Sequence, residues 1–500
     1  MMGRGTATLL VLLTVSGSAS FAGEKKIDDV RAGTFAFGSM AIGQAKDVNY
    51  ARAEGLGLVP KSPLDAYLNG VLAKLLAQSP VQGVPARVYL RASADWAAAT
   101  TADANIYVAL GTLLRLDDED EVAAVLAHEV SHAILGHANA DVVTNVQQRL
   151  LQLSDLAVGT TEALHGSGLT TGAAKATAGG ARADDQSRAL LLNNMIIVPA
   201  WTRGQERDAD HLGVDLLTRA GYAPQAMASL LRKQAKCEGE RAGDQQAQAL
   251  DKQLFGVDAN TEVREQTREA ARRIGIDDPG VGDLAGGVIG KVLEWGSKKV
   301  EEGKSAHPKT EERITDIESY VAQEYPQDRT RAARAEPWEA AKDQDGTAEL
   351  LENYIAAIEA KGRLRQGDLG AARKLSKASL AEPTRTHAYP NYVAAAVDIT
   401  QGNSAPALAA YETALAGPEP AGAIYSEAAA LYEQTGKRDR AVTVIENGYE
   451  RLQEPPSLTL PLIRAYRTAG RQADADRVAA KCALRWPRMQ ALCADEAKGQ

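Results

Sequence analysis

Two histidines and a glutamate at a fixed spacing are the residues of this 500-residue chain best suited to chemistry. They lie in segment 117–137, which reads as one helix with acidic residues in its first turn, where the helix dipole favours them. His128 and His132 are four residues apart, so both imidazoles project from one side of that helix. This geometry suits a shared zinc ion at about 2.0–2.1 Å from each nitrogen. Glu129 points about 100° further round the helix, near enough to act as a general base without being a ligand.

A catalytic zinc site needs a third protein ligand and an open fourth position. In the metzincin pattern the third ligand would be a histidine at position 138, which is alanine here. The alternative is a glutamate on a later helix, and segment 206–210 supplies Glu206. Asp210, four residues on, is placed to hydrogen-bond a ligand imidazole and fix its tautomer. The sequence therefore predicts one Zn²⁺ per chain, held by His128, His132 and Glu206.

Two further histidines lie near these motifs. His307 precedes Pro308 just before another predicted helix, and a loop position would let it reach the metal as a reversible fourth ligand. An incidental histidine beside a helix-entry proline explains the same residues equally well. His137 is expected to pack at or cap the end of the first helix, where a partial positive charge suits the dipole; it is not counted as a ligand.

The C-terminal part of the chain repeats with a period of 34–35 residues. Each unit carries a glycine that permits a tight turn between two helices, and five positions later an alanine that lets the helices approach closely. The glycines are Gly367, Gly402, Gly436 and Gly470, and the alanines are Ala372, Ala407, Ala441 and Ala475. This pattern resembles the tetratricopeptide repeat, whose solenoids bind partner segments on a concave surface.

The first 22 residues are typical of a cleaved export signal. Arg4 gives a positive start, residues 7–15 form a short apolar core, and small residues at Ser20 and Ala22 predict cleavage after Ala22. The mature chain is therefore expected in a bacterial periplasm. No later apolar run approaches the ~20 residues of a membrane-spanning helix. The longest such run is 190–201, and the sequence fits three roles for it: a lid, a substrate groove or a membrane-surface contact.

Composition and cysteine usage limit the remaining classes of function. The chain is 45% apolar and 24% charged, as in globular proteins, and its length suggests two or more domains. A net charge of −9 argues against a nucleic-acid partner. Cys482 and Cys493 are positioned to bridge two neighbouring helices in an oxidising compartment.

Together these pieces resemble the HtpX/BepA/Oma-like group of zinc metallopeptidases, whose eukaryotic relatives include the CAAX prenyl protease. The matching segments run in family order over residues 40–320, and they are 54–60, 106–108, 128–132, 206–210, 220–224 and 307–314. Followed by tetratricopeptide repeats, the layout looks like the periplasmic BepA type. In that subgroup the loop histidine, here His307, can occupy the open zinc position and hold the enzyme latent.

The resemblance implies a domain layout for the mature chain. An α+β zincin-like metallopeptidase domain would occupy residues 23–325 and an all-α tetratricopeptide solenoid residues 346–490. The charged, poorly periodic stretch 326–345 between them is expected to be a linker.

One segment departs from the family pattern. Two strands are predicted, 88–91 and 106–109, and relatives usually carry Asn-Ala-Phe-Ala-x-Pro-Gly-Gly just before the second. This chain has Ala-Ala-Ala-Thr-Thr-Ala-Asp-Ala at 97–104. A strand beside a zincin cleft binds extended substrate by edge pairing, so the departure is expected to affect substrate binding and specificity and not zinc binding.

Two functions fit the sequence. The first is a zinc endopeptidase that hydrolyses misfolded or stalled envelope proteins, with the repeats recruiting substrate or the outer-membrane assembly machinery. The second is a periplasmic chaperone or assembly factor that acts mainly through its repeats, with a latent protease site. A structural zinc site on a pure scaffold would not need Glu129 between the histidines.

Overall fold

The computed structural model describes residues 25–39, 41–53, 57–139, 201–239, 310–486 and 489–499. The predicted leader (1–22), the apolar run up to residue 200 and His307 lie outside the described residues. Within the described ranges no helix is both long enough and apolar enough to cross a membrane.

The first half of the chain is built on a small mixed sheet. Strand β3 (Arg87–Arg91) pairs in parallel with β5 (Asn105–Ala109), and β4 (Ala98–Thr100) pairs antiparallel with the other side of β5. The predicted strand pair is therefore confirmed, and β4 lies at one edge of this sheet. A separate two-residue pairing joins β1 (Gly33–Thr34) to β2 (Val81–Gln82).

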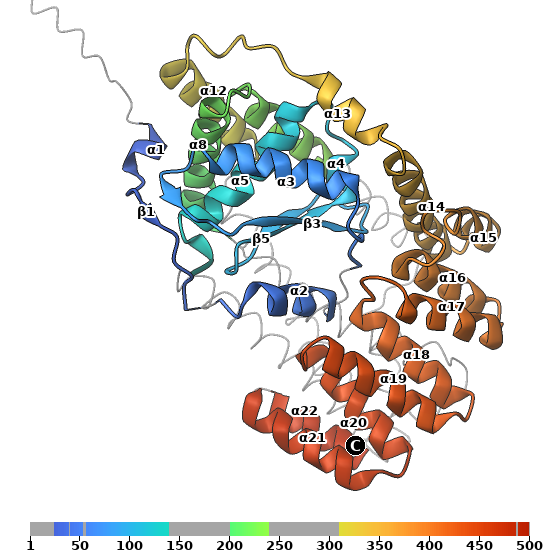
Figure 1. The fold of residues 1–500 in the computed structure, drawn as a ribbon. Coiled ribbons are helices and arrows are strands. Elements are labelled where there is room, and N and C mark those ends of the chain that lie inside the picture. The colour runs from blue at the N-terminus through green and yellow to red at the C-terminus, as the bar shows by residue number, and fades with distance from the viewer. Residues whose placement is uncertain are drawn as a thin grey trace, which may run out of the picture.

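Three helices pack over one face of the sheet: α3 (Pro63–Leu76), α5 (Glu119–Ile134) and α8 (Arg203–Arg219) (Figure 1). Strand residues Val88 and Leu90 point into this core because side chains alternate along a strand. Helices α5 and α8 approach closely enough that a Cβ at Gly213 of α8 would lie 3.4 Å from the backbone of Ala127 and His128 in α5. The smaller elements of this half are α1 (Lys26–Asp29), α4 (Leu110–Leu113), η1 (His137–Asn139), the helical residues 226–239, and α12 (Thr310–Glu324).

The stretch 326–345 is not an extended spacer. It contains helix α13 (Ala335–Lys342), whose Trp338 is 1% exposed and belongs to the core of the first half. The indole of Trp338 donates its N–H to the carbonyl of Leu116 at 3.0 Å and stacks on Tyr67. A single buried tryptophan thus anchors a segment whose sequence shows little hydrophobic periodicity.

The second half is a series of paired helices. The pairs are α14 (Thr347–Arg365) with α15 (Leu369–Ala378), α16 (Ala388–Thr400) with α17 (Ser404–Ala416), α18 (Gly422–Gln434) with α19 (Arg438–Arg451), and α20 (Thr459–Thr468) with α21 (Gln472–Arg485). A short η2 (Pro456–Leu458) precedes α20, and α22 (Gln490–Lys498) closes the series. All four predicted turn glycines have φ between +76° and +79°, and all four alanines are 0% exposed, so both predictions are confirmed. The disulfide between Cys482 and Cys493 joins α21 to α22.

Helix α2 (Gln44–Ala53) lies between the sheet and the paired helices (Figure 1). On the solenoid side, Arg52 pairs with Glu419 at 3.1 Å and donates to the carbonyl of Pro420 at 3.0 Å. A Cβ at Gly422 would lie 2.2 Å from the carbonyl oxygen of Ala53, so this contact tolerates only glycine.

The other side of α2 is fixed to the sheet through Asp47. One carboxylate oxygen of Asp47 accepts hydrogen bonds from Thr101, Asn105 and Tyr107 at 3.0, 2.7 and 2.9 Å. Helix α2 therefore ties the solenoid to the turn that follows the edge strand β4.

Candidate metal centre

The three predicted ligands come together where α5 meets α8. The Nε2 atoms of His128 and His132 are 3.2 Å apart, and Glu206 Oε2 is 3.7 Å from His128 Nε2. One potential ligand atom from each residue lies within 4.8 Å of the others. Two imidazole nitrogens and a carboxylate oxygen match the donors that zinc prefers, and their separations suit one ion at about 2.0–2.2 Å from each.

Local sequence determines where these side chains sit on their helices. Asp118 caps α5 by accepting the backbone N–H of Glu121. Thr202 and Gln205 form a capping box at the start of α8, which places Glu206 in the first turn of that helix. Both ligand-bearing helices therefore begin at fixed points.

Behind the ligands, Asp210 contacts His128 as predicted. Its Oδ1 lies 2.9 Å from His128 Nδ1, which leaves Nε2 facing the cluster, and the side chain is almost fully buried. Burial alone would raise the pKa of Asp210, but the charge and hydrogen bonds of Arg313, together with His128, hold it well below its usual value. Burial would lower the pKa of His128, but the carboxylates of Asp210 and Glu206 outweigh that effect and raise it.

Arg313 is the cation that balances this buried charge. It binds both oxygens of Asp210 at 2.8 Å and lies 3.0 Å from Glu206 Oε2. Burial would lower the pKa of Arg313, but Asp210 and Glu206 raise it, so it stays charged. The segment carrying Arg313 was part of the family resemblance, but its role was not predicted, because an arginine on an amphipathic helix usually faces solvent.

Glu129 is buried beside the ligands, and its carboxylate lies within reach of strand β4. The hydroxyl of Thr100 is 2.9 Å from Glu129 Oε2. Burial raises the pKa of Glu129, and the nearby His128 and the Thr100 hydrogen bond offset only part of that shift. A carboxylate with a raised pKa is suited to accept and return a proton near neutral pH.

Two aromatic residues that the sequence interpretation did not assign to the site surround His132. His137 Nδ1 lies 2.9 Å from His132 Nδ1, and Trp201 stacks on the His132 ring with centroids 4.4 Å apart. His137 packs at the end of the helix, where it is 8% exposed, and burial lowers its pKa to about 4, which favours the neutral imidazole. The sequence feature that could have indicated a role for His137 is its position five residues after His132.

The predicted fourth ligand, His307, is outside the described residues and stays a prediction. The departing segment 97–104 forms β4 and the turn after it. Ala104, the last residue of this segment, has φ of +60°, so alanine here adopts a conformation that favours glycine.

Comparison with known proteins agrees with the geometry of the centre. Residues 64–321, just over half of the chain, match peptidase family M48. The beta-barrel assembly-enhancing protease of Yersinia pestis is 28% identical over 241 residues, which is 46% of either chain. The protein of the same name from Escherichia coli K12 is 25% identical over 231 residues, 45% of either chain. The chain therefore spans about half the length of these relatives. On this evidence the chain belongs to peptidase family M48 and is a metallopeptidase.

Proposed function

We propose that this chain is a zinc-dependent endopeptidase that hydrolyses peptide bonds of misfolded or stalled envelope proteins. The observation that carries the proposal is the convergence of His128, His132 and Glu206 within 4.8 Å beside a buried Glu129. We assign the first half a zincin-like fold on the same grounds, because both histidines and the glutamate base come from one helix.

Each residue of the centre has a role in this proposal. Zinc would polarise the scissile carbonyl and lower the pKa of the attacking water. Glu129 takes the proton from that water and returns it to the leaving amine. Asp210 holds His128 in the tautomer that directs Nε2 to the metal, and Arg313 pairs with both Asp210 and Glu206. His307 remains the candidate for a reversible fourth ligand that keeps the site latent.

Strand β4 is the proposed substrate platform. It lies at the edge of the described sheet, and an extended polypeptide can add to such an edge through backbone hydrogen bonds. Thr100 belongs to β4 and contacts Glu129, so a substrate strand paired there would lie beside the catalytic base.

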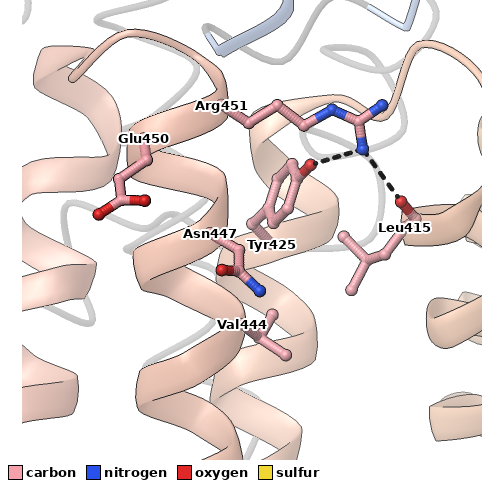
Figure 2. Close-up of a pocket in the computed structure, with 6 residues that line it drawn as sticks. All are labelled: Leu415, Tyr425, Val444, Asn447, Glu450 and Arg451. Atoms are coloured by element: carbon pink, nitrogen blue, oxygen red, sulfur yellow. Dashed lines mark hydrogen bonds between the residues drawn. The ribbon is translucent and has the colours of Figure 1, made fainter.

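We assign the paired helices over 346–490 to tetratricopeptide repeats that recruit substrate or partner. Both relatives are named for beta-barrel assembly, so we extend the proposal to a periplasmic location after cleavage at Ala22 and to a partner in outer-membrane assembly. A cavity of about 570 Å³ between α17, α18 and α19 offers a surface for such contacts. Arg451 forms one wall of it, reaching the hydroxyl of Tyr425 and the carbonyl of Leu415 (Figure 2).

The second candidate is an assembly factor that works mainly through this solenoid. The extent of the helical pairs and the cavity between them favour it, and it uses the same chain without requiring turnover.

One set of variants tests both proposals. We expect the purified mature chain to contain one zinc and to cleave an unfolded protein such as reduced casein. Glu129→Gln should keep the metal and lose cleavage, whereas Glu206→Gln should lose both. Glu427→Gln, a change within the solenoid, is the matched control and should lose neither.

A folded wild-type chain that takes up no zinc would refute the endopeptidase. If Glu129→Gln restores envelope integrity to a null strain as well as the wild type does, the binding function dominates.

A further inference from the structure

We propose that His137 and Trp201 are positioning residues for the ligand His132: His137 fixes its tautomer and Trp201 fixes the plane of its ring. This inference rests on the proposed zinc site and assigns two residues to its support. The two ligand histidines would then be oriented by different means, one by a carboxylate and one by a second imidazole.

The tautomer follows from the two contacts of His132. Its Nε2 faces the Nε2 of His128 at 3.2 Å, so this nitrogen must be free of a proton to bind a metal. A neutral imidazole then carries its proton on Nδ1. His132 Nδ1 lies 2.9 Å from His137 Nδ1, and of two nitrogens in such contact one donates and the other accepts. His132 therefore donates and His137 accepts, with the His137 proton on its Nε2.

His137 can hold this position because the chain turns sharply after α5. Helix α5 ends at Ile134, and η1 (His137–Asn139) follows at once. Gly136 between them has φ of +66°, a conformation that glycine adopts readily. The turn brings the His137 ring back to within 5.0 Å of the His132 ring, measured between centroids, and the side chain is buried there.

Trp201 restrains the same ring from its face. The two ring planes differ by 18° at a centroid distance of 4.4 Å, which is a stacked arrangement. The indole is 7% exposed and packs on Ala138 and the partly buried Ala102, so it is held on two further sides. Trp201 also directly precedes Thr202, the cap of α8, and so links the position of His132 to the helix that carries Glu206.

The choice of a neutral acceptor has a chemical consequence. Asp210 beside His128 adds a negative charge to the surroundings of the metal, but His137 beside His132 adds none. His137 thus orients the second ligand without further neutralising the cation, which preserves the positive charge that a Lewis acid needs.

The test is zinc affinity, measured by chelator competition on the full mature chain. His137→Leu removes the acceptor and should weaken zinc binding by about 10–100-fold, the usual effect of losing a partner of a ligand histidine. His137→Asn keeps an acceptor oxygen near the position of Nδ1 and should restore most of the affinity. Trp201→Phe keeps a stacking ring and should bind more tightly than Trp201→Leu. His387→Leu, at a half-buried histidine that contacts Tyr354 in the solenoid, is the control and should match the wild type.

The outcomes separate this inference from the function on which it rests. If the wild type binds zinc and His137→Leu binds it equally well, the positioning role is wrong and the zinc site stands. If the Asn variant is as weak as the Leu variant, loss of packing and not loss of an acceptor is the cause, and the inference is again overturned. If the wild type itself binds no zinc, the proposed function fails.

Discussion

Thr100 of the edge strand β4 contacts Glu129 of helix α5 twice: its hydroxyl oxygen is 2.9 Å from the carboxylate and 2.8 Å from the backbone carbonyl. A threonine hydroxyl has a single proton, so it donates to one of these oxygens at a time. Either contact holds β4 against the helix turn that carries the base. The strand proposed to bind substrate and the residue proposed to move the proton are thus directly connected.

Replacing Thr100 with valine should slow peptide hydrolysis while leaving zinc content unchanged. Valine keeps the shape of the side chain but donates no hydrogen bond, so the Glu129 carboxylate loses a fixed partner. A correctly placed general base contributes about 10²–10⁴-fold to the rate, so loss of this fixed position should lower kcat by roughly tenfold or more. Thr100→Ser keeps the hydroxyl and should remain close to the wild type. Equal rates for the valine and serine variants would contradict this role.

Arg313→Met should destabilise the protease half strongly. It leaves the carboxylates of Asp210 and Glu206 buried without their cation, and breaking a buried pair in this way costs about 3–5 kcal/mol. Arg219→Met is the matched control, because the ion pair of Arg219 with Asp28 is exposed and such pairs contribute about 0–1 kcal/mol. Urea unfolding of both variants without metal is the measurement. Similar losses for the two would show that Arg313 does not balance buried charge.

Removing zinc should lower the stability of the wild type but not of Glu206→Gln. A ligand that binds only the folded state stabilises it by about 2.7 kcal/mol at one hundred times its Kd. The melting temperature of the wild type should therefore rise with added zinc and fall with a chelator. Glu206→Gln, with a weakened third ligand, should respond far less. An equal response of both chains would place the stabilising zinc elsewhere.

Regular local patterns account for what the sequence could predict. The four-residue spacing of His128 and His132, and the repeated glycine and alanine positions of the solenoid, each depend on the geometry of one helix or one turn. Glu206 could be identified only because a third ligand was required and the metzincin position is alanine. Its approach to the histidines depends on how closely α5 and α8 pack. Gly213 permits this close packing, but the sequence alone does not show that it does so.

Long-range contacts account for what could not be predicted. The contact of Arg313 with Asp210 spans 103 residues, and that of Arg52 with Pro420 spans 368. No periodic pattern in the sequence indicates such a pair, and each of the two arginines taken alone reads as a solvated charge. Trp338 similarly reads as part of a charged linker until its burial against Tyr67 is seen.

Arg52→Ala should loosen the contact between the protease half and the solenoid. The side chain is largely buried between the halves, and its loss leaves the Pro420 carbonyl and Glu419 without their donor. Amide exchange in α2 and in the 417–422 loop should accelerate, while exchange in α21 and α22 should not change. Arg440→Ala removes an exposed ion pair with Glu412 and is the control. Unchanged exchange in α2 would mean that the Gly422 contact alone is sufficient.

The attachment of α22 should weaken in acid through Glu496. This carboxylate binds Arg464 and Arg467 on α20. Burial would raise its pKa, but the two arginines outweigh that effect and lower it. An acid whose pKa is lowered in the folded state stabilises it fully above its unfolded pKa, about 4.3 for glutamate, and this contribution is lost as the pH falls through the folded pKa.

Glu496→Gln should therefore accelerate amide exchange in α22 at pH 7, after correction for intrinsic rates, and the difference from the wild type should shrink below about pH 4. Asp495→Asn, at the neighbouring acid, should have little effect at either pH. A difference for Glu496→Gln that is the same at pH 7 and pH 3.5 would show that packing, and not the charge of Glu496, attaches the last helix.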